Sequence, residues 1–113
     1  MTTILLIDDD SKLTDPLQYQ LSDLGFRTCV AHDGRAGLGM AMVEKPDVIV
    51  LDIMLPEMDG WQFRAEQRRD PRLAHIPVIV LTGLRAAANI DADAVLHKPV
   101  DAERLLSIVK RFC

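Results

Sequence analysis

The sequence lacks an excess of positive charge, a long apolar run and a cysteine framework. With 13 Lys and Arg against 17 Asp and Glu, its net charge of -4 opposes binding to nucleic acid phosphates and to anionic membrane surfaces. No apolar run approaches the roughly 20 residues of a membrane span, and no basic leader precedes Ile4, so we expect a cytoplasmic protein. Cys29 and Cys113 have no motif spacing, which indicates reduced thiols rather than a disulfide.

Internal repeats, linkers and low-complexity segments are absent as well. The chain has 113 residues, of which 49% are hydrophobic and 27% are charged, a balance typical of a folded protein. We therefore expect one globular domain with one core over residues 1–113.

Five short apolar runs predict the strands of a sheet. Residues 4–7, 48–51 and 76–81 are almost entirely aliphatic, as in strands of a parallel sheet that are buried on both faces. Residues 27–31 and 94–96 are predicted to be two further brief strands.

Helical segments are predicted between and after these strands, over residues 12–24, 35–44, 60–69 and 102–112, with a short fourth helix within 84–93. Pro16 leaves the start of the first helix open, either near Lys12 or with Asp15 as the cap. Gly37 and Gly39 each weaken the second helix by about 1 kcal/mol relative to Ala. The alternation predicts an α/β fold, a doubly wound parallel sheet with helices on both faces.

The ends of four strands offer an acid, a second acid, a hydroxyl and an ammonium group. Asp8 and Asp9 follow the first strand, Asp52 the third, Thr82 the fourth and Lys98 the fifth. Ligands of such sheets bind outside the carboxyl ends of the strands, so these side chains should share one site. Two carboxylates about 4 Å apart repel by roughly 4 kcal/mol at an effective dielectric near 20, so clustered acids require a cation. Carboxylate oxygens with open positions favour Mg²⁺.

Each of these residues alone also has an ordinary structural explanation. Asp8 and Asp52 could be helix caps or turn residues, Thr82 a strand exit, and Lys98 part of a surface turn. Their combination argues for a phosphoryl-transfer site, in which Asp52 is the nucleophile and neighbouring charges neutralise the phosphoryl oxygens.

The sequence resembles the receiver domains of response regulators over essentially its whole length. The resemblance implies a five-stranded sheet in the order 2-1-3-4-5. It rests on Asp8-Asp9, on residues 51–60 (Leu-Asp-Ile-Met-Leu-Pro-Glu-Met-Asp-Gly), on Thr82-Gly83 and on Lys98-Pro99.

The resemblance further implies that Asp52 accepts a phosphoryl group from the phosphohistidine of a sensor histidine kinase or a histidine phosphotransfer protein. Such a domain is no turnover enzyme. It catalyses its own phosphorylation and dephosphorylation and thereby switches the binding of an output partner or effector domain, which the sequence does not name.

By the same resemblance, Mg²⁺, which Mn²⁺ can replace, is held by Asp9, Asp52 and the backbone carbonyl of Met54, with Asp8 acting through water. Thr82 and Lys98 would each bind a phosphoryl oxygen. The Lys98-Pro99 peptide is often cis in the family.

The sequence departs from the family pattern in two places. Val95 stands where receivers usually carry a Tyr or Phe that follows the movement of the threonine, and the segment between Thr82 and Lys98 is several residues short. We expect a weakened or replaced output signal. Met54 and Leu84, two residues beyond Asp52 and Thr82, cannot orient an attacking water, so we also expect slow self-dephosphorylation.

Three alternatives differ in their requirements. A receiver fold that signals by docking alone is consistent with Val95 and the short fourth helix, but not with the complete set of acids, threonine and lysine. An aspartate-nucleophile phosphatase would place its nucleophile on the first strand in an Asp-x-Asp-x-Thr pattern, whereas Lys12 stands at the last position. A flavin-binding protein needs a phosphate-binding loop after that strand, where three acids would repel phosphate.

Overall fold

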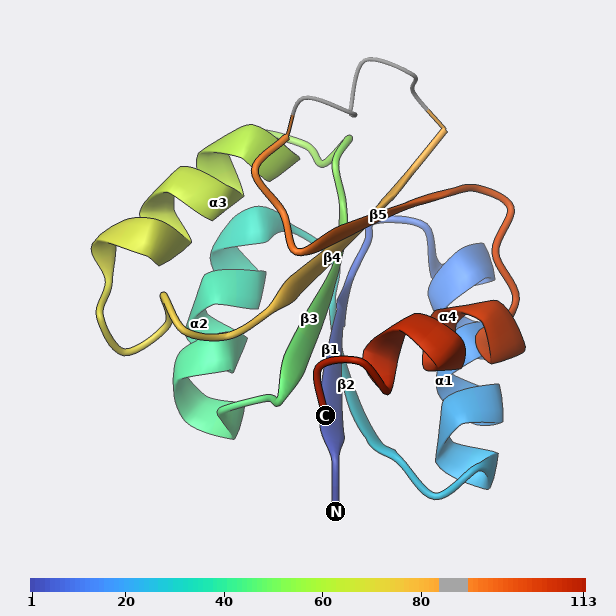
Figure 1. Ribbon diagram of the computed structural model, residues 1–113. Coiled ribbons are helices and arrows are strands. Elements are labelled where there is room, and N and C mark those ends of the chain that lie inside the picture. The colour runs from blue at the N-terminus through green and yellow to red at the C-terminus, as the bar shows by residue number, and fades with distance from the viewer. Residues whose placement is uncertain (84–89) are drawn as a thin grey trace.

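The chain folds into one parallel sheet between two layers of helices, as the computed structural model in Figure 1 shows for residues 1–83 and 90–113. The strand order is β2-β1-β3-β4-β5, and every neighbouring pair is parallel. This confirms the predicted fold class and strand order. The strands are β1 (Thr3–Ile7), β2 (Arg27–Ala31), β3 (Val48–Asp52), β4 (Val78–Thr82) and β5 (Ala94–His97).

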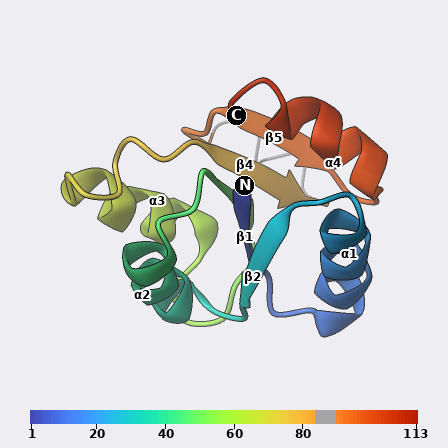
Figure 2. The same ribbon diagram turned by 90° about the horizontal axis from the view of Figure 1, so that it is seen from below.

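The helices are shared between the two faces of the sheet (Figures 1 and 2). Helices α1 (Ser11–Asp23) and α4 (Ala102–Val109) cover one face, and α2 (Gly34–Glu44) and α3 (Gly60–Arg69) cover the other. The label α4 thus denotes the last predicted helix. The short helix predicted after Thr82 falls mainly on residues 84–89, outside the described residues, and residues 90–93 are not helical. No helix in the described ranges combines the length and apolarity needed to cross a bilayer.

The core consists of one apolar layer on each side of the sheet. Successive side chains of a strand point to opposite faces, so each central strand contributes to both layers. Phe63 of α3 is completely buried on one side and Leu105 of α4 on the other. The buried strand residues toward α2 and α3 are Leu5, Ile7, Ala31, Ile49, Leu51, Val78 and Val80. Those toward α1 and α4 are Ile4, Leu6, Val48, Val50, Ile79, Leu81 and Leu96.

Helix α1 begins at Ser11, so the prediction of a start near Lys12 is correct and the alternative cap, Asp15, is wrong. The Asp10 side chain accepts a hydrogen bond from the Lys12 amide at 3.0 Å and caps the helix. Pro16 lies inside the helix on its exposed side. An exposed position leaves water free to bond the carbonyl that the missing proline amide would otherwise satisfy.

The first residue of α3 packs against the residue that follows β3. The Asp59 side chain accepts from the Gln62 amide, and the Gln62 side chain accepts from the Asp59 amide, both at 2.9 Å, which forms a capping box. A Cβ on Gly60 would lie 2.8 Å from the Cα of Ile53. Only glycine allows this approach, which fixes the loop that follows Asp52.

Two buried polar residues of α3 were not anticipated from the sequence. Arg64, 5% exposed, donates from Nε to the Asp91 carbonyl at 2.6 Å and from Nη1 to Gln67 Oε1 at 2.8 Å. Gln67, completely buried, donates from Nε2 to the carbonyls of Leu73 and Ile76 at 3.0 and 2.9 Å. These bonds attach α3 to the segment before β4 and to the segment before β5.

The same network reaches the first residue of β4 and the residue that precedes β5. Arg64 Nη2 lies 3.5 Å from Asp93 Oδ2, and this oxygen accepts from the Val78 amide at 2.7 Å. The Asp93 amide in turn donates to the Val78 carbonyl at 2.9 Å. Burial lowers the pKa of Arg64, and the charge of Arg68 acts in the same direction. The guanidinium therefore depends on these acceptors to offset its desolvation.

The glycines of α2 differ in their surroundings although their sequence contexts are alike. A Cβ on Gly37 would lie 2.5 Å from Ile7 Cδ1, so this glycine lets the helix approach β1. A Cβ on Gly39 would have no heavy atom within 4 Å. Packing therefore explains Gly37 but not Gly39.

We expect opposite effects from the two alanine substitutions in α2. Gly39→Ala should raise the free energy of unfolding by about 1 kcal/mol because alanine has the higher helix propensity and nothing obstructs its Cβ. Gly37→Ala should lower it because the new methyl group overlaps Ile7. Urea denaturation of both variants and the parent checks this, and a destabilised Gly39→Ala protein would contradict it.

Candidate functional site

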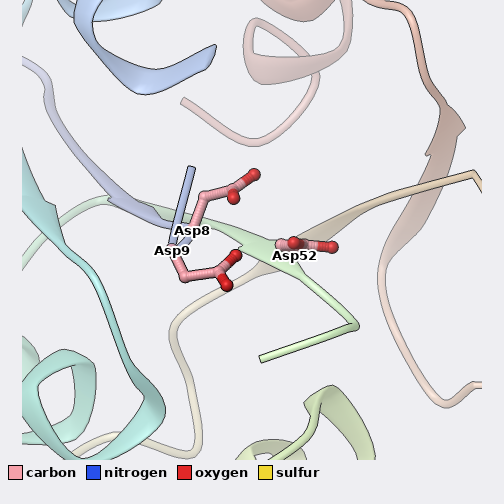
Figure 3. A group of neighbouring side chains, drawn as sticks. All are labelled: Asp8, Asp9 and Asp52. Atoms are coloured by element: carbon pink, nitrogen blue, oxygen red, sulfur yellow. The ribbon is translucent and has the colours of Figure 1, made fainter. Parts of the chain in front are cut away.

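Three carboxylates converge at the carboxyl end of the central strands. Asp8 and Asp9 follow β1 and Asp52 ends β3, and one oxygen of each lies within 4.8 Å of the others (Figure 3). The pairing of Ile7 with Leu51 in the adjacent parallel strands β1 and β3 produces this arrangement. Asp8 and Asp52 are only 3% and 6% exposed, whereas Asp9 is exposed to solvent. The sequence predicted this convergence, and the structure confirms it.

The ammonium of Lys98 lies among the buried carboxylates. Its Nζ is 3.2 Å from Asp8 Oδ2 and 3.5 Å from Asp52 Oδ2. The Lys98 amide donates to the Thr82 carbonyl at 2.8 Å, so the ends of β4 and β5 are joined. The Lys98-Pro99 peptide bond is cis. Lys98 is therefore the internal cation that partly balances the acids.

The buried Asp8 is fixed from several sides. Its amide donates to the Ala31 carbonyl at 3.1 Å, and its Oδ1 accepts from the Asp10 amide at 2.9 Å. The Asp8 carbonyl lies 3.0 Å from Nδ1 of His32. Sequence analysis did not include His32, although its position directly after β2 placed it at the same edge of the sheet.

Asp52 and the residues beside it complete the site. Asp52 Oδ1 accepts from the Met54 amide at 3.2 Å, and the Met54 side chain is 59% exposed beside it. Thr82, at the end of β4, is completely buried. Since β4 lies next to β3, the structure places Thr82 at the same edge of the sheet as Asp52.

The charges of the site influence one another strongly. Burial raises the pKa of Asp52 and the charge of Asp8 raises it further, against the opposing effects of the Met54 amide and of Lys98. Burial disfavours the Lys98 ammonium, but the carboxylates of Asp52 and Asp8 outweigh this effect and raise the pKa of Lys98. One ammonium therefore lies beside two buried carboxylates, and the third carboxylate of the cluster, Asp9, is exposed next to them.

The donor set suits a hard divalent cation. Carboxylate oxygens from two adjacent strands are available within a few ångströms, and one of the three side chains is open to solvent. Mg²⁺ prefers such oxygen ligands and keeps water in its remaining positions. Lys98 does not balance all of the negative charge of the cluster, and a divalent cation would neutralise the remainder.

Known proteins share both the sequence and the fold of this chain. A family model described as the response regulator receiver domain matches residues 4–110. The chain is 39% identical over 116 residues to the DNA-binding dual master transcriptional regulator RpaA of Synechocystis, covering 97% of this chain and 48% of RpaA. It spans about half the length of RpaA and of other curated regulators that it matches.

Solved structures give the same result. The chemotaxis response regulator CheY4 of Vibrio cholerae superimposes with a TM-score of 0.90 at 28% identity, covering 100% of this chain and 99% of CheY4. The receiver domain of the sensor histidine kinase PA1611 from Pseudomonas aeruginosa, solved with magnesium coordinated in its active-site cleft, has a TM-score of 0.89 at 26% identity. The alignment with PA1611 covers 98% of this chain and 96% of the PA1611 domain.

Receiver domains bind Mg²⁺ at an acidic site and take phosphate from histidine kinases, and they are not, in general, turnover enzymes. The match of the family model over nearly the whole chain, together with the acidic site at the end of β3, makes this chain a member of the response regulator receiver family of two-component signalling systems.

Proposed function

We propose that Asp52 of this receiver domain, taken as a single domain over residues 1–113, accepts a phosphoryl group from the phosphohistidine of a sensor histidine kinase or a histidine phosphotransfer protein. The observation that carries the proposal is the Asp52 carboxylate, buried beside Asp8 and Asp9 and 3.5 Å from Lys98 Nζ. An Asp52 oxygen forms a bond to phosphorus while the bond between phosphorus and the imidazole nitrogen breaks. The bonding electron pair leaves with the imidazole.

We propose that Asp9, Asp52 and the backbone carbonyl of Met54 hold Mg²⁺, with Asp8 acting through water and Mn²⁺ as a possible replacement. When bound, the cation supplies positive charge that neutralises the phosphoryl oxygens and offsets the repulsion among the acids. Thr82 and Lys98 would each bind a phosphoryl oxygen. Their positions at the ends of β4 and β5 support these roles.

The proposed domain catalyses its own phosphorylation and dephosphorylation and switches the binding of an output partner. Val95, which replaces the usual aromatic residue, lies half-buried in β5 against the apolar layer of α2 and α3. Valine is smaller than tyrosine and carries no hydroxyl. A movement of Thr82 should therefore change the position of this side chain less than it would change that of a tyrosine. We therefore expect the output signal to differ from the threonine-to-aromatic type.

We predict that acetyl phosphate or phosphoramidate with Mg²⁺ adds one phosphoryl group to the chain and that Asp52→Asn abolishes the adduct. Intact mass spectrometry measures it directly. Asp59→Asn is a matched control because asparagine can cap α3 as aspartate does and the substitution leaves the site unchanged. An adduct that persists in Asp52→Asn, or none in the parent, would favour a receiver fold that signals by docking alone.

We predict a long-lived phosphoryl group because the Met54 side chain cannot position water for attack on phosphorus. Met54→Asn should shorten the half-life several-fold, since an amide can orient a water molecule, and Met54→Leu should leave it unchanged. Both substitutions fall on an exposed side chain and should preserve the fold. Loss of the adduct is followed by mass spectrometry after removal of the donor. A half-life of only seconds in the parent protein would contradict the prediction.

The raised pKa of Asp52 predicts a pH-dependent cost to the metal-free fold. The folded state binds the Asp52 proton more tightly than the unfolded state, so this group lowers stability as pH rises through its folded pKa. At neutral pH without metal, Asp52→Asn should therefore raise the free energy of unfolding.

Thermal melts in EDTA at pH 7 and again at pH 4 measure this effect, which should shrink at the lower pH. Mg²⁺ should raise the melting temperature of the parent more than that of Asp52→Asn. The prediction fails if Asp52→Asn melts below the parent in EDTA at pH 7.

A further inference from the structure

Arg64 is a charged residue on the inner side of helix α3. It is 5% exposed, and Phe63 and Gln67 of the same helix are completely buried. The inner side of a surface helix ordinarily carries apolar side chains. A buried guanidinium loses its hydration, and replacing a buried ion pair by apolar side chains is often neutral or stabilising. Packing of α3 on the sheet therefore does not by itself require an arginine at this position.

The segment that leads into β5 supplies acceptors for Arg64. Its Nε donates to the Asp91 carbonyl at 2.6 Å, and its Nη2 lies 3.5 Å from Asp93 Oδ2. Arg68, one turn further along α3, contacts the same segment, with its Nη2 2.8 Å from Asp91 Oδ2. Both side chains of the Arg68 pair are exposed, and exposed ion pairs contribute little. The buried contacts of Arg64 should therefore hold residues 91–93 to α3 more firmly than those of Arg68 do.

One short strand joins residues 91–93 to the acidic site. β5 runs from Ala94 to His97, and Lys98 follows it directly. β5 is the last strand in the sheet order, with β4 as its neighbour. Because an edge strand is hydrogen-bonded along one side, fewer bonds hold it in place than hold a central strand. Arg64 thus contacts the chain just before this edge strand, and the acidic cluster contacts it just after.

Phosphorylation changes the set of partners that Lys98 has in the acidic site. In the unphosphorylated chain its Nζ lies 3.2 Å from Asp8 Oδ2 and 3.5 Å from Asp52 Oδ2. A phosphoryl group on Asp52, the proposed reaction on which this inference rests, brings additional negative charge and acceptor oxygens to the site. The ammonium gains contacts that the unphosphorylated chain does not offer, so the two states differ in the position that they favour for Lys98.

We propose that Arg64 couples the acidic site to helix α3. A change in the position of Lys98 passes along β5 to residues 91–93 and from there through Arg64 to the helix. Helix α3 then belongs to the surface that differs between the phosphorylated and the unphosphorylated domain. The route follows the backbone of β5 and does not depend on an aromatic side chain at position 95, where this chain has valine.

Trp61 is placed to report on this connection. It is the single tryptophan of the chain, lies in the first turn of α3 and is 40% exposed. Together with Arg64, Ile90 and Asp91 it lines a hollow of about 200 Å³. A displacement of α3 relative to residues 90 and 91 therefore changes the surroundings of the indole ring and with them its fluorescence.

The first experiment follows the response of α3 to phosphorylation. Acetyl phosphate is added to the full chain with Mg²⁺ present throughout, intact mass confirms the adduct, and amide shifts and Trp61 emission are recorded. The parent should respond both at Lys98 and within α3. In Arg64→Met the shifts within α3 should fall at least threefold, while the adduct and the shifts at Lys98 persist. Methionine is unbranched and apolar, so it fills the buried position without a charge.

Two further variants separate coupling from folding. Arg69→Met removes an arginine of the same helix whose ion pair with Glu66 lies within α3, so it should respond as the parent does. Asp93→Asn removes the charge that faces Arg64 but keeps an oxygen for the Val78 amide, and should reduce the shifts within α3 at least twofold. Asp93→Asn provides the test if circular dichroism shows that Arg64→Met is unfolded.

The second experiment uses no phosphoryl donor. Lys98→Met removes the ammonium from the acidic site, and its effect on the amide shifts of α3 is measured in the parent and in the Arg64→Met background. The shifts that Lys98→Met causes within α3 should be at least threefold larger in the parent than in that background.

Shifts within α3 that are equal in the parent and in Arg64→Met, or that are absent from the parent although the adduct forms, would overturn the proposal. An equal loss of response in Arg69→Met would overturn it as well, because it would indicate a general effect on the helix. If no adduct forms, the proposed function fails, and the comparison based on Lys98→Met decides on the coupling alone. If the adduct forms and α3 does not respond, the coupling fails and the role of Asp52 stands.

Discussion

The repulsion among the carboxylates that follow β1 and β3 is the constraint on which the rest of the site depends. Asp8 and Asp52 are both buried, and Lys98 lies 3.2 and 3.5 Å from their carboxylates, to which the Asp10 and Met54 amides also donate. One ammonium does not neutralise three acids, so the folded chain retains a local negative charge. A charge of this sign is one that a divalent cation would neutralise.

The parallel sheet brings the charged side chains of the site together. Because adjacent strands run in the same direction, residues that are far apart in the sequence, such as Asp8 and Lys98, end at one edge. The hydrogen bond from the Lys98 amide to the Thr82 carbonyl fixes the last two strands relative to one another. The short strands and the close approach at Gly60 keep the loops around Asp52 compact.

Sequence reasoning predicted those parts of the protein that depend on local pattern. Aliphatic runs located the strands, and the rule that ligands bind at strand ends predicted that Asp9, Asp52 and Lys98 lie together. It did not distinguish Asp10 from Asp15 as a helix cap, since both are good caps. It also missed Arg64 and Gln67, because most of their partners are backbone carbonyls of distant residues, which leave no signature in the sequence. Gly37 and Gly39 likewise look alike in the sequence and differ only in what they face.

The buried guanidinium of Arg64 has a mechanical consequence for the edge of the sheet. Arg64 connects α3 to the residues that precede β5. Helix α3 follows the loop after Asp52, and β5 leads to Lys98. Asp93 extends this connection to the first residue of β4. The hydrogen bond and the ion pair of Arg64 therefore oppose a shift of the start of β5 relative to α3. A movement of Lys98 therefore requires either that β5 bends or that α3 moves with it.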